Sequence, residues 1–294
     1  MHWKIKNLAF KALEATPGRR HLHAVGQAFV TRRRRMAITK SIKTYSLHVE
    51  TMEQHGGAAD KIVMEFGCGR NLIAALLFSA AGARAVHAFD IQRLATTELV
   101  NDAIAQARAL NLPWRGANPW PSVSDLDVDL QAKYRIFYRA PGDARASGLE
   151  PNSVDWVCST ATLEHIPPLT IDAIMSEVRR VLRPSGRSSM IIDYHDHYCS
   201  TDKSITPYNF YQFSADQWTR YNPSMHYVNR LRHSDFLAQF DRLGFEVCDV
   251  RTIVPPDSEA MLNSIEIAPA FRAYEREDLA IISGVFLLAP KPVS

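Results

Sequence analysis

The sequence predicts an α/β protein with a doubly wound, seven-stranded and mostly parallel sheet whose last strand runs antiparallel. Strand-like and helix-like stretches alternate along its 294 residues, a pattern that favours right-handed crossovers between parallel strands. One strand, at 61–66, leads into alternate glycines, Gly67 and Gly69, and then into a helical segment. A second apolar run ends in Asp90, 21 residues after Gly69. The turn and the acid together predict a site for a nucleoside-bearing cofactor.

The expected elements follow from apolar periodicity and from residues that end helices. Strands are expected near 61–66, 85–90, 135–139, 154–159, 187–193, 245–251 and 282–289, and helices near 71–81, 94–110, 169–182 and 233–243. Gly82, Gly186 and Gly244 stand where helices are expected to stop. No helix long enough for a compact crossover separates the last two strands, so the final strand is expected to pair antiparallel.

Two segments interrupt the alternation. Residues 111–133 hold two tryptophans, three prolines and three aspartates, a composition typical of an inserted surface loop. Residues 194–232 concentrate aromatic residues and histidines directly after the strand at 187–193. Because open α/β sheets bind ligands beyond the carboxyl ends of their strands, we interpret this second insertion as a lid over a site. The alternative is a satellite aromatic cluster that covers the sheet edge.

Composition and cysteine spacing bound the class of protein. Hydrophobic residues make up 46% of the chain, enough for a full core in one α/β unit with additions. Cys68, Cys158, Cys199 and Cys248 match neither metal-ligand pairs nor a dense disulfide framework, so a reduced, cytoplasmic setting is expected. No apolar run reaches the roughly 18 residues that span a membrane, and the start lacks the features of a secretory signal.

Basic residues concentrate in an N-terminal arm, predicted as residues 1–56, ahead of a main domain at 57–294. Residues 1–43 hold 11 Lys or Arg against Glu14 alone, so this segment carries +10 and, with a net charge of +3, the remainder carries −7. Helical spacing relates five apolar residues of the arm, namely Ile5, Leu8, Ala9, Ala12 and Leu13. That spacing predicts a helix that buries this face.

The charges of the arm allow two interpretations. They are solvated on a docked helix, or they form a site for anionic lipid or a phosphorylated substrate, which includes peripheral contact with a membrane. The acidic body and the lack of aromatic residues among the basic ones argue against nucleic acid.

The motifs together resemble those of the class I S-adenosylmethionine-dependent methyltransferases. EFGCG at 65–69 resembles the first motif, HAFD at 87–90 the ribose-binding strand end, and PGDA at 141–144 the segment that meets adenine. SVDWVCSTATLEHI and VRRVLRPSGR resemble the fourth-strand motif and the helix and turn before the fifth strand. The match covers roughly Lys61 to Arg251 in the expected order. It implies a Rossmann-like fold and S-adenosyl-L-methionine as the cofactor.

The resemblance also implies a set of cofactor-binding residues: Glu65, Gly67, Cys68, Gly69, Asp90, Ile91, Asp143, Ala144, Thr160 and, ahead of the first strand, Tyr45. One departure is visible, because Asn71 stands where the family commonly has a third glycine. Asn tolerates left-handed backbone angles and can cap a helix, so it is expected to preserve the turn. Leu72 breaks the Gly-x-Gly-x-x-Gly spacing, which argues against a nicotinamide cofactor. A finer resemblance is to bacterial, methyltransferase-11-like proteins of natural-product or polysaccharide type.

Methyl transfer from a sulfonium requires an aligned acceptor and, for a hydroxyl or amine, a group that takes its proton. The candidate catalytic residues are His165, beside Glu164 after the fourth strand, and His195 and His197, which flank Asp196 beyond the fifth. Alternatively, His165 begins a helix and binds backbone. No metal is expected, because His195 and His197 still need a third ligand, such as His226 or Asp193, that the spacing does not demand.

Four further residues are candidates for substrate binding: Tyr194, Tyr211, Arg230 and Arg232. The two arginines suit a carboxylate or phosphate of the acceptor. Alternatively, they are exposed charges at the start of the helix at 233–243.

Three functions remain open on the sequence. The first is methyl transfer from S-adenosyl-L-methionine to an oxygen or nitrogen of a small molecule, in bacterial secondary metabolism or saccharide modification. The second is cyclisation or lysis of the cofactor, with release of methylthioadenosine and formation of azetidine-2-carboxylate. The third is a non-catalytic binding protein whose arm docks on a membrane or a partner.

Overall fold

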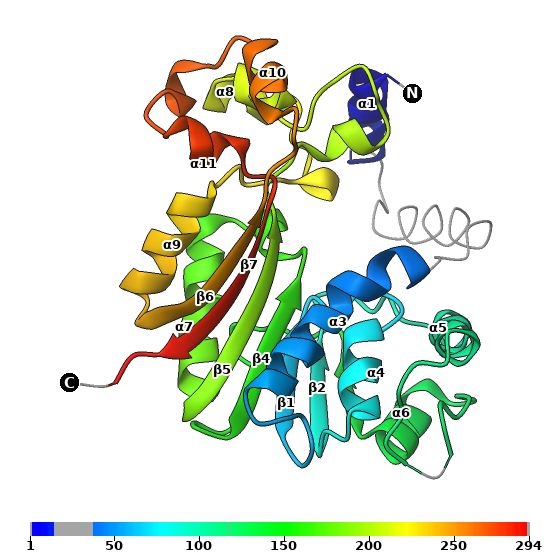
Figure 1. Ribbon diagram of the computed structural model, residues 1–294. Helices are drawn as coiled ribbons and strands as arrows, with labels where there is room; N and C mark the ends of the chain where they lie inside the picture. The colour runs from blue at the N-terminus through cyan, green and yellow to red at the C-terminus, as the bar shows by residue number, and fades with distance from the viewer. Residues whose placement is uncertain (1, 15–37, 117, 293–294) are drawn as a thin grey trace.

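The computed structural model describes residues 2–14, 38–116 and 118–292. A seven-stranded sheet forms its centre, in the order β3-β2-β1-β4-β5-β7-β6 (Figure 1). The strands are β1 (Ile62–Phe66), β2 (Ala85–Phe89), β3 (Ile136–Arg139), β4 (Val154–Thr160), β5 (Leu182–Asp193), β6 (Phe245–Ile253) and β7 (Ser283–Pro290). Strands β1 to β5 are parallel, whereas β7 pairs antiparallel with β5 and β6. The predicted fold class, with its antiparallel last strand, is confirmed.

Helices connect and cover the strands. The α-helices are α1 (Trp3–Glu14), α3 (Ile38–Gln54), α4 (Ile73–Ala80), α5 (Thr97–Ala109), α6 (Leu126–Tyr134), α7 (Pro168–Val181), α8 (Ala215–Thr219), α9 (His233–Arg242), α10 (Ser258–Asn263) and α11 (Arg276–Ala280). Short 3-10 helices are η1 (Leu163–His165), η2 (His197–Ser200), η3 (Asn209–Gln212), η4 (Ser224–His226) and η5 (Pro269–Phe271). Within the described ranges, no helix has both the length and the apolar character needed to cross a bilayer.

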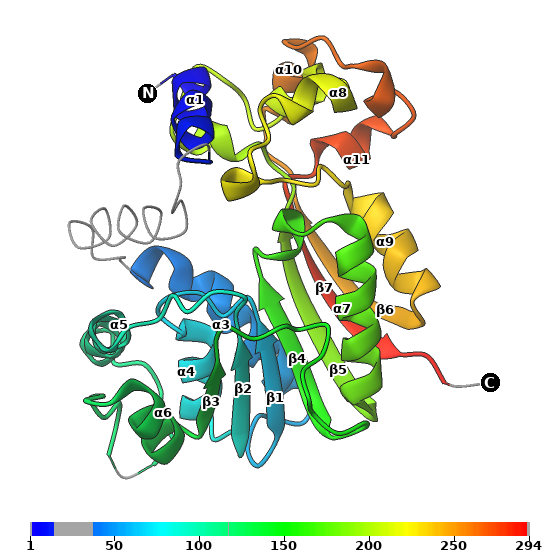
Figure 2. The same cartoon turned by 180° about the vertical axis from the view of Figure 1, so that it is seen from behind.

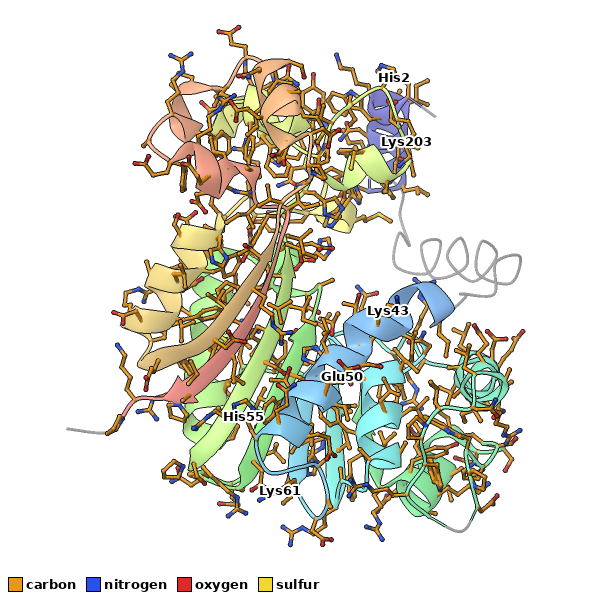
Figure 3. The ribbon with its side chains drawn as sticks, in the orientation of Figure 1. His2, Lys43, Glu50, His55, Lys61 and Lys203 are labelled. Carbon is orange, nitrogen blue, oxygen red and sulfur yellow. The ribbon has the colours of Figure 1, made fainter. Side chains whose placement is uncertain are left out.

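The sheet has an apolar core on each face. Val63 and Met64 are neighbours on β1, so their side chains point to opposite faces, and they belong to different core clusters. Helices α3 to α6 lie on the Val63 face, and α7 and α9 lie on the Met64 face (Figures 1 and 2). The outer face of α3 is polar, as the exposed Lys43 and Glu50 show (Figure 3).

A separate cluster of aromatic residues lies beyond the end of the sheet where β5 ends and β7 begins (Figure 1). We call it the aromatic cap, formed by residues 194–232, residues 254–282 and α1. Its buried side chains include Trp3, Tyr198, Tyr208, Phe210, Tyr211, Trp218, Leu262, Phe271 and Leu279. Most aromatic rings of residues 194–232 pack against one another. They therefore fit the alternative interpretation, a satellite aromatic cluster, better than a lid. No sequence pattern indicated that residues 254–282 and α1 would join them.

The interpretation of residues 111–133 as a surface loop was wrong in part. Residues from Leu126 onward form α6, and the Asp125 side chain caps this helix by accepting a hydrogen bond from the Val128 N–H. Trp120 is buried in the core of the α3 face. The aspartates suggested a loop because Asp is a poor former of helix interiors, yet it is a favourable N-cap and first-turn residue.

The predicted buried face of the N-terminal helix was also wrong. Ile5 and Leu8 are 60% and 67% exposed, whereas Trp3 and Asn7 are buried. The Trp3 ring packs between Tyr198, Phe213 and Tyr221. A tertiary partner thus selects a face other than the one that apolar periodicity favours. The basic residues at 19–35 lie outside the described part of the chain.

Candidate functional site

The glycine turn after β1 is held against the end of β2. The N–H groups of Gly67 and Cys68 donate to the Phe89 carbonyl at 2.9 and 3.1 Å. Gly67 and Gly69 have φ of 71° and 67°, a region that favours glycine. A Cβ on Gly67 would lie 2.2 Å from Thr162 Oγ1, whereas one on Gly69 would meet no atom within 4 Å. Gly67 is therefore required for packing, and Gly69 borders open space.

The expected role of Asn71 in this turn was wrong in detail. The left-handed residue is Leu72, with φ of 53°, and it occupies the N-cap position of α4. Asn71 is buried, and its side-chain oxygen accepts from the Ile73 N–H at 3.4 Å. The turn thus keeps a left-handed residue, one position later than the asparagine suggested.

Asp90 connects the turn to the end of β2. Its Oδ2 accepts from the Gly69 N–H at 3.0 Å and its Oδ1 from the Gln92 N–H at 2.9 Å. Burial raises the pKa of this carboxyl, and the two N–H donors oppose the rise. Since a carboxylate oxygen accepts two hydrogen bonds, each oxygen keeps capacity for one more donor. The neighbouring Ile91 side chain is 65% exposed.

Glu65 lies near the end of β1, two residues before Gly67. It is buried, and its Oε2 has no hydrogen-bond partner among the described residues. Burial raises its pKa to about 8; the Ala75 N–H opposes this and the Asp90 charge adds to it. Burial raises the pKa of the Tyr45 hydroxyl, on α3, to about 12, and the nearby Glu65 charge adds to the rise.

Two more predicted cofactor residues are engaged with protein partners. Asp143 is half-exposed and is held by the Arg145 guanidinium, which lowers its pKa. Thr160 Oγ1 lies 2.8 Å from His48 Nε2, and His48 Nδ1 lies 2.6 Å from Ser189 Oγ. His48 links α3 to β4 and β5, and burial lowers its pKa to about 3. Sequence reasoning missed it, although its position between Tyr45 and Met52 places it on the inner side of α3. Ala144, beside Asp143, is partly buried against the core of the Met64 face.

Four histidines gather beyond the carboxyl ends of β4 and β5, and we call them the imidazole cluster: His165, His195, His197 and His226. The His197 ring centroid lies 4.8 Å from that of His165, 4.7 Å from that of His195 and 6.1 Å from that of His226. The three predicted catalytic histidines are thus brought together. His226, named in the sequence only as a conceivable ligand, joins them from the aromatic cap.

The turn that carries His165 is fixed by the cap. Asn229 donates from its side chain to the carbonyls of Leu163 and Ile166, and its N–H donates to the Glu164 carbonyl. His165 Nδ1 lies 2.7 Å from the Tyr227 carbonyl oxygen. Because a carbonyl only accepts, Nδ1 carries the proton in this contact and Nε2 of the neutral ring keeps a free lone pair.

The inner part of the cluster is buried and has few partners. Burial lowers the pKa of His197 to about 2, and the positive charges of the other three histidines and of Lys6 lower it further. Burial, then Lys6 and His165, lower the pKa of His226 to about 4. Lys6 comes from α1 and was not singled out in the sequence. These rings are therefore neutral near pH 7.

The four predicted substrate-binding residues make contacts within the aromatic cap. Arg232 is 1% exposed, and its guanidinium donates to the Tyr194 carbonyl at 3.0 Å and to the Tyr211 hydroxyl at 2.6 Å. Tyr194 and Tyr211 are themselves buried. Arg230 donates to the carbonyls of Phe210 and Phe213. These polar groups hold the aromatic cap together, although Arg230 is only partly buried. Their role in substrate binding stays a prediction.

A hollow of about 380 Å³ lies elsewhere, between the end of α4 and the 111–135 segment. Ser79, Gly82, Trp114, Lys133 and Tyr134 are among the residues that line it. It contains none of the residues predicted to bind cofactor or acceptor. The candidate site is therefore defined by the chemistry at the glycine turn and the imidazole cluster.

The chain matches a family model described as a methyltransferase domain over residues 33–250. This match covers more than half of the chain, and the protein belongs to the methyltransferase domain family. Membership agrees with the glycine turn, with Asp90 and with S-adenosyl-L-methionine as the cofactor. A search of curated proteins gave no match to this chain.

Several solved structures resemble the chain at low sequence identity. Magnesium protoporphyrin IX methyltransferase from Synechocystis PCC 6803, with bound SAH, is 13% identical with a TM-score of 0.49, over 87% of this chain and 85% of that one. Phosphoethanolamine N-methyltransferase 2 of Haemonchus contortus, in complex with S-adenosyl-L-methionine, is 16% identical with a TM-score of 0.48, over 84% and 53%. The YcgJ protein of Bacillus subtilis is 15% identical with a TM-score of 0.47, over 86% and 99%. Identities this low leave the acceptor unspecified.

Proposed function

We propose that this protein transfers a methyl group from S-adenosyl-L-methionine to an oxygen or nitrogen of a small-molecule acceptor. The observation that supports this most directly is the adjacency of the two halves of the site. Gly67, in the cofactor turn, packs against Thr162, three residues before His165. An acceptor beside the imidazole cluster therefore lies next to the cofactor's methionine end.

The proposed cofactor contacts follow from the hydrogen-bonding capacity and the exposed surface that each residue leaves unused. Gly69 leaves the backbone open to the nucleoside, and Asp90 has capacity for two ribose hydroxyls. The Glu65 Oε2, which has no partner in the described structure, suits the ammonium of the methionine part. Ile91 offers an exposed apolar surface to adenine, near Asp143 and Ala144. Cys68, Thr160 and Tyr45 line the same region and complete the proposed set.

In the proposed reaction the acceptor's lone pair displaces the methyl group from sulfur. The carbon–sulfur bond breaks as the new bond forms, and S-adenosylhomocysteine leaves neutral. The acceptor's proton passes to the free Nε2 of His165, whose ring is oriented by its contact with the Tyr227 carbonyl. His195 and His197 stand beside this ring and line the acceptor pocket.

The setting of the reaction is part of the proposal. The sequence resemblance suggests bacterial secondary metabolism or saccharide modification, and the cysteine spacing suggests a cytoplasmic setting. The basic arm suits peripheral contact with an anionic membrane. The division into an arm at 1–56 and a main domain at 57–294 is proposed for the sequence, although the structure packs α1 against the aromatic cap and α3 against the sheet.

The test is incubation of the full chain with methyl-labelled cofactor and a panel of small hydroxyl and amine acceptors. Labelled product with S-adenosylhomocysteine is expected. Methylthioadenosine formed without any acceptor would instead favour cyclisation or lysis, and cofactor binding without turnover over the whole panel would favour a binding protein.

A matched pair of variants tests the base. His165→Ala is expected to lower the rate constant by about 10² to 10⁴ with cofactor affinity unchanged. His55→Ala is the control, because His55 is also exposed and also contacts a backbone carbonyl through Nδ1, at 2.8 Å from Thr51, but lies at the end of α3 (Figure 3). Equal rates for the two variants would exclude His165 as the base.

A further inference from the structure

The Glu164 carboxylate is the least satisfied charged group near the imidazole cluster. Its residue is 1% exposed, and neither carboxylate oxygen has a hydrogen-bond partner in the described part of the chain. Burial and then the Asp193 charge raise the pKa of this carboxyl well above its usual range, and the N–H groups of Glu164 and Asp193 oppose the rise. Neither N–H makes a hydrogen bond of ordinary geometry to it. A buried carboxylate without partners is costly, so it requires either a proton or a cation.

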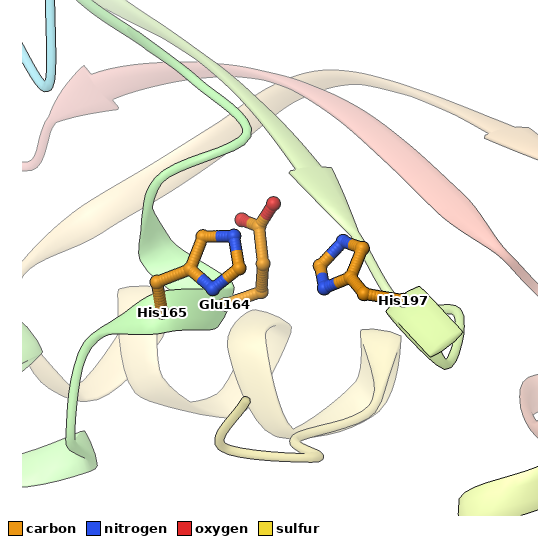
Figure 4. A group of neighbouring side chains, drawn as sticks. All are labelled: Glu164, His165 and His197. Atoms are coloured by element: carbon orange, nitrogen blue, oxygen red, sulfur yellow. The ribbon is translucent and has the colours of Figure 1, made fainter. Parts of the chain in front are cut away.

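The side chains around Glu164 are those that bind a divalent cation. One ligand atom each from Glu164, His165 and His197 lie within 4.8 Å of one another. Figure 4 shows the Glu164 carboxylate rising between the two imidazole rings. Zinc bonds to carboxylate oxygen and imidazole nitrogen measure about 2.0–2.2 Å, which places two ligands about 3–4 Å apart. Small side-chain rotations therefore bring all three atoms within reach of one ion.

The two histidines are prepared for this role. Histidine ligands usually donate their second ring N–H to a carbonyl or carboxylate, which fixes the ring and its tautomer. His165 makes this contact through Nδ1 with the Tyr227 carbonyl, and Nε2 is left for a metal. His197 has a buried Nδ1 with no hydrogen-bond partner within the described ranges.

A second group of ligands shares His197. Asp193, His195 and His197 also place one ligand atom each within 4.8 Å of the others. The two groups together supply two carboxylates and three imidazoles, with His197 common to both. The Lys6 ammonium acts on His197 and His226, and it also interacts with the buried Asp196 carboxylate. With Asp196 counted, three carboxylates stand against one ammonium, which leaves the cluster suited to a doubly charged cation.

We infer that Glu164, His165 and His197 form a binding site for a divalent transition-metal ion of the zinc type, with Asp193 and His195 as additional ligands. Imidazole with carboxylate favours such ions over magnesium or calcium. The site lies on the acceptor side, where a bound ion would polarise an acceptor hydroxyl and promote loss of its proton. The His165 lone pair serves either as a ligand or as a base in any one molecule. Metal binding is therefore measured first, apart from methyl transfer.

The experiment is calorimetric titration of the chelator-treated full chain with Zn²⁺. One ion per chain is expected. Glu164→Gln and His165→Ala are each expected to weaken binding by tenfold or more. The visible spectrum of the Co²⁺ form gives a second readout, since nitrogen and oxygen ligands from this set should produce absorption that His165→Ala alters.

Two histidine variants serve as matched controls. His226→Ala removes a ring beside His197 that belongs to neither ligand group, and His55→Ala removes a histidine far from the cluster. Both are expected to bind Zn²⁺ within twofold of the unmodified chain. Glu164→Gln alters a buried side chain, so thermal melting checks that this variant still folds. Because His165 is exposed, His165→Ala tests the site even if Glu164→Gln does not fold.

Three outcomes would overturn the inference: no saturable Zn²⁺ binding, binding that His165→Ala leaves unchanged, or binding that a folded Glu164→Gln leaves unchanged. The first would mean that Glu164 is a neutral, protonated acid. Methyl transfer measured with and without Zn²⁺ then separates this inference from the proposed function. Activity without the ion would leave the function standing, and metal binding without activity would leave the site standing.

Discussion

The cofactor side and the acceptor side of this site are built in different ways. The cofactor side comes from one strand–turn–helix unit and the end of the neighbouring strand, joined by backbone N–H groups that donate to Phe89 and Asp90. The acceptor side brings together the ends of β4 and β5, η4 and α1, through contacts between residues far apart in the sequence.

The two sides also differ in what remains unsatisfied. On the cofactor side, Glu65 has one buried oxygen without a partner; on the acceptor side, Glu164, His197 and His226 have four such atoms between them, counting only described residues. The polar groups of the cofactor side are thus mostly paired, whereas the acceptor side presents several buried polar atoms that are available for contacts. Substitutions on the cofactor side should therefore lower stability or cofactor affinity, and substitutions on the acceptor side should lower the rate of methyl transfer.

Gly67→Ala should show the largest effect, because this glycine joins the two sides. The new Cβ would lie 2.2 Å from Thr162 Oγ1 at a φ of 71°. Left-handed strain of about 1–2 kcal/mol and overpacking of about 1–3 kcal/mol together predict a loss of roughly 3 kcal/mol in the free energy of unfolding. Denaturant titration measures it. A variant as stable as the parent chain would show that the Thr162 contact is loose.

Arg232→Leu tests whether Arg232 binds substrate, as predicted, or only stabilises the aromatic cap. The guanidinium holds the Tyr194 carbonyl, next to His195, and the Tyr211 hydroxyl. Loss of these charge-assisted hydrogen bonds should lower the free energy of unfolding by about 2–3 kcal/mol. Any rise in KM should accompany that loss. A stable Arg232→Leu protein with a large increase in KM alone would support the substrate-binding role.

Glu65 should make stability depend on pH. Its folded-state pKa is about 8 against 4.5 for an ordinary Glu, so the folded chain holds a proton that the unfolded chain has already released. Stability from this group is full below about pH 4.5 and is lost as pH rises toward about 8. The slope is about 1.4 kcal/mol per pH unit, hence about 2 kcal/mol between pH 6.5 and 8.

The Glu65→Gln variant isolates this slope. Melts of both proteins are compared between pH 6.5 and 8, and because both contain the same buried histidines, proton uptake by those rings in the unfolded chain cancels in the difference. The difference between the two proteins should change with pH as calculated. Because an ammonium favours the ionised carboxylate, the cofactor affinity of the parent chain should rise over the same range and that of Glu65→Gln should stay flat. Parallel stability curves would contradict the assignment.

Gly69→Ala complements Gly67→Ala. Its φ of 67° predicts a loss of about 1 kcal/mol, but its Cβ would enter open space. If the nucleoside occupies that space, cofactor affinity should fall by about 5- to 150-fold, since overpacking costs about 1–3 kcal/mol. Calorimetry with S-adenosyl-L-methionine measures it. An unchanged affinity would place the nucleoside elsewhere.

The contrast between local contacts on the cofactor side and long-range contacts on the acceptor side explains which features the sequence could predict. The sheet, its order of elements and the glycine turn were predictable because periodicity and turn residues are local signals. The buried side of α1 was not predictable, because the partners of Trp3 lie about 200 residues away in the sequence. Asp125 looked like part of a loop because N-cap chemistry and loop chemistry use the same residues.

The acceptor side was only partly predictable for the same reason. His165, His195 and His197 were visible as histidines near strand ends. The burial of Glu164 and the approach of Lys6 depend on contacts that no local pattern encodes. Arg232 was predicted to bind substrate or to be an exposed charge; its burial was not foreseen, because burial of an arginine without an acidic partner is rare.

Lys6 gives the smallest expected effect and the sharpest test of how the acceptor side is assembled. Its ammonium acts on His197 and His226, so Lys6→Gln should remove a repulsion and tighten Zn²⁺ binding by about fivefold or less, as expected for one partly screened charge. Lys4→Gln is the control, because Lys4 lies on the same helix, is exposed and faces the Trp3 ring. If both variants shift the affinity equally, the effect comes from net charge, and α1 does not contribute specifically to the imidazole cluster.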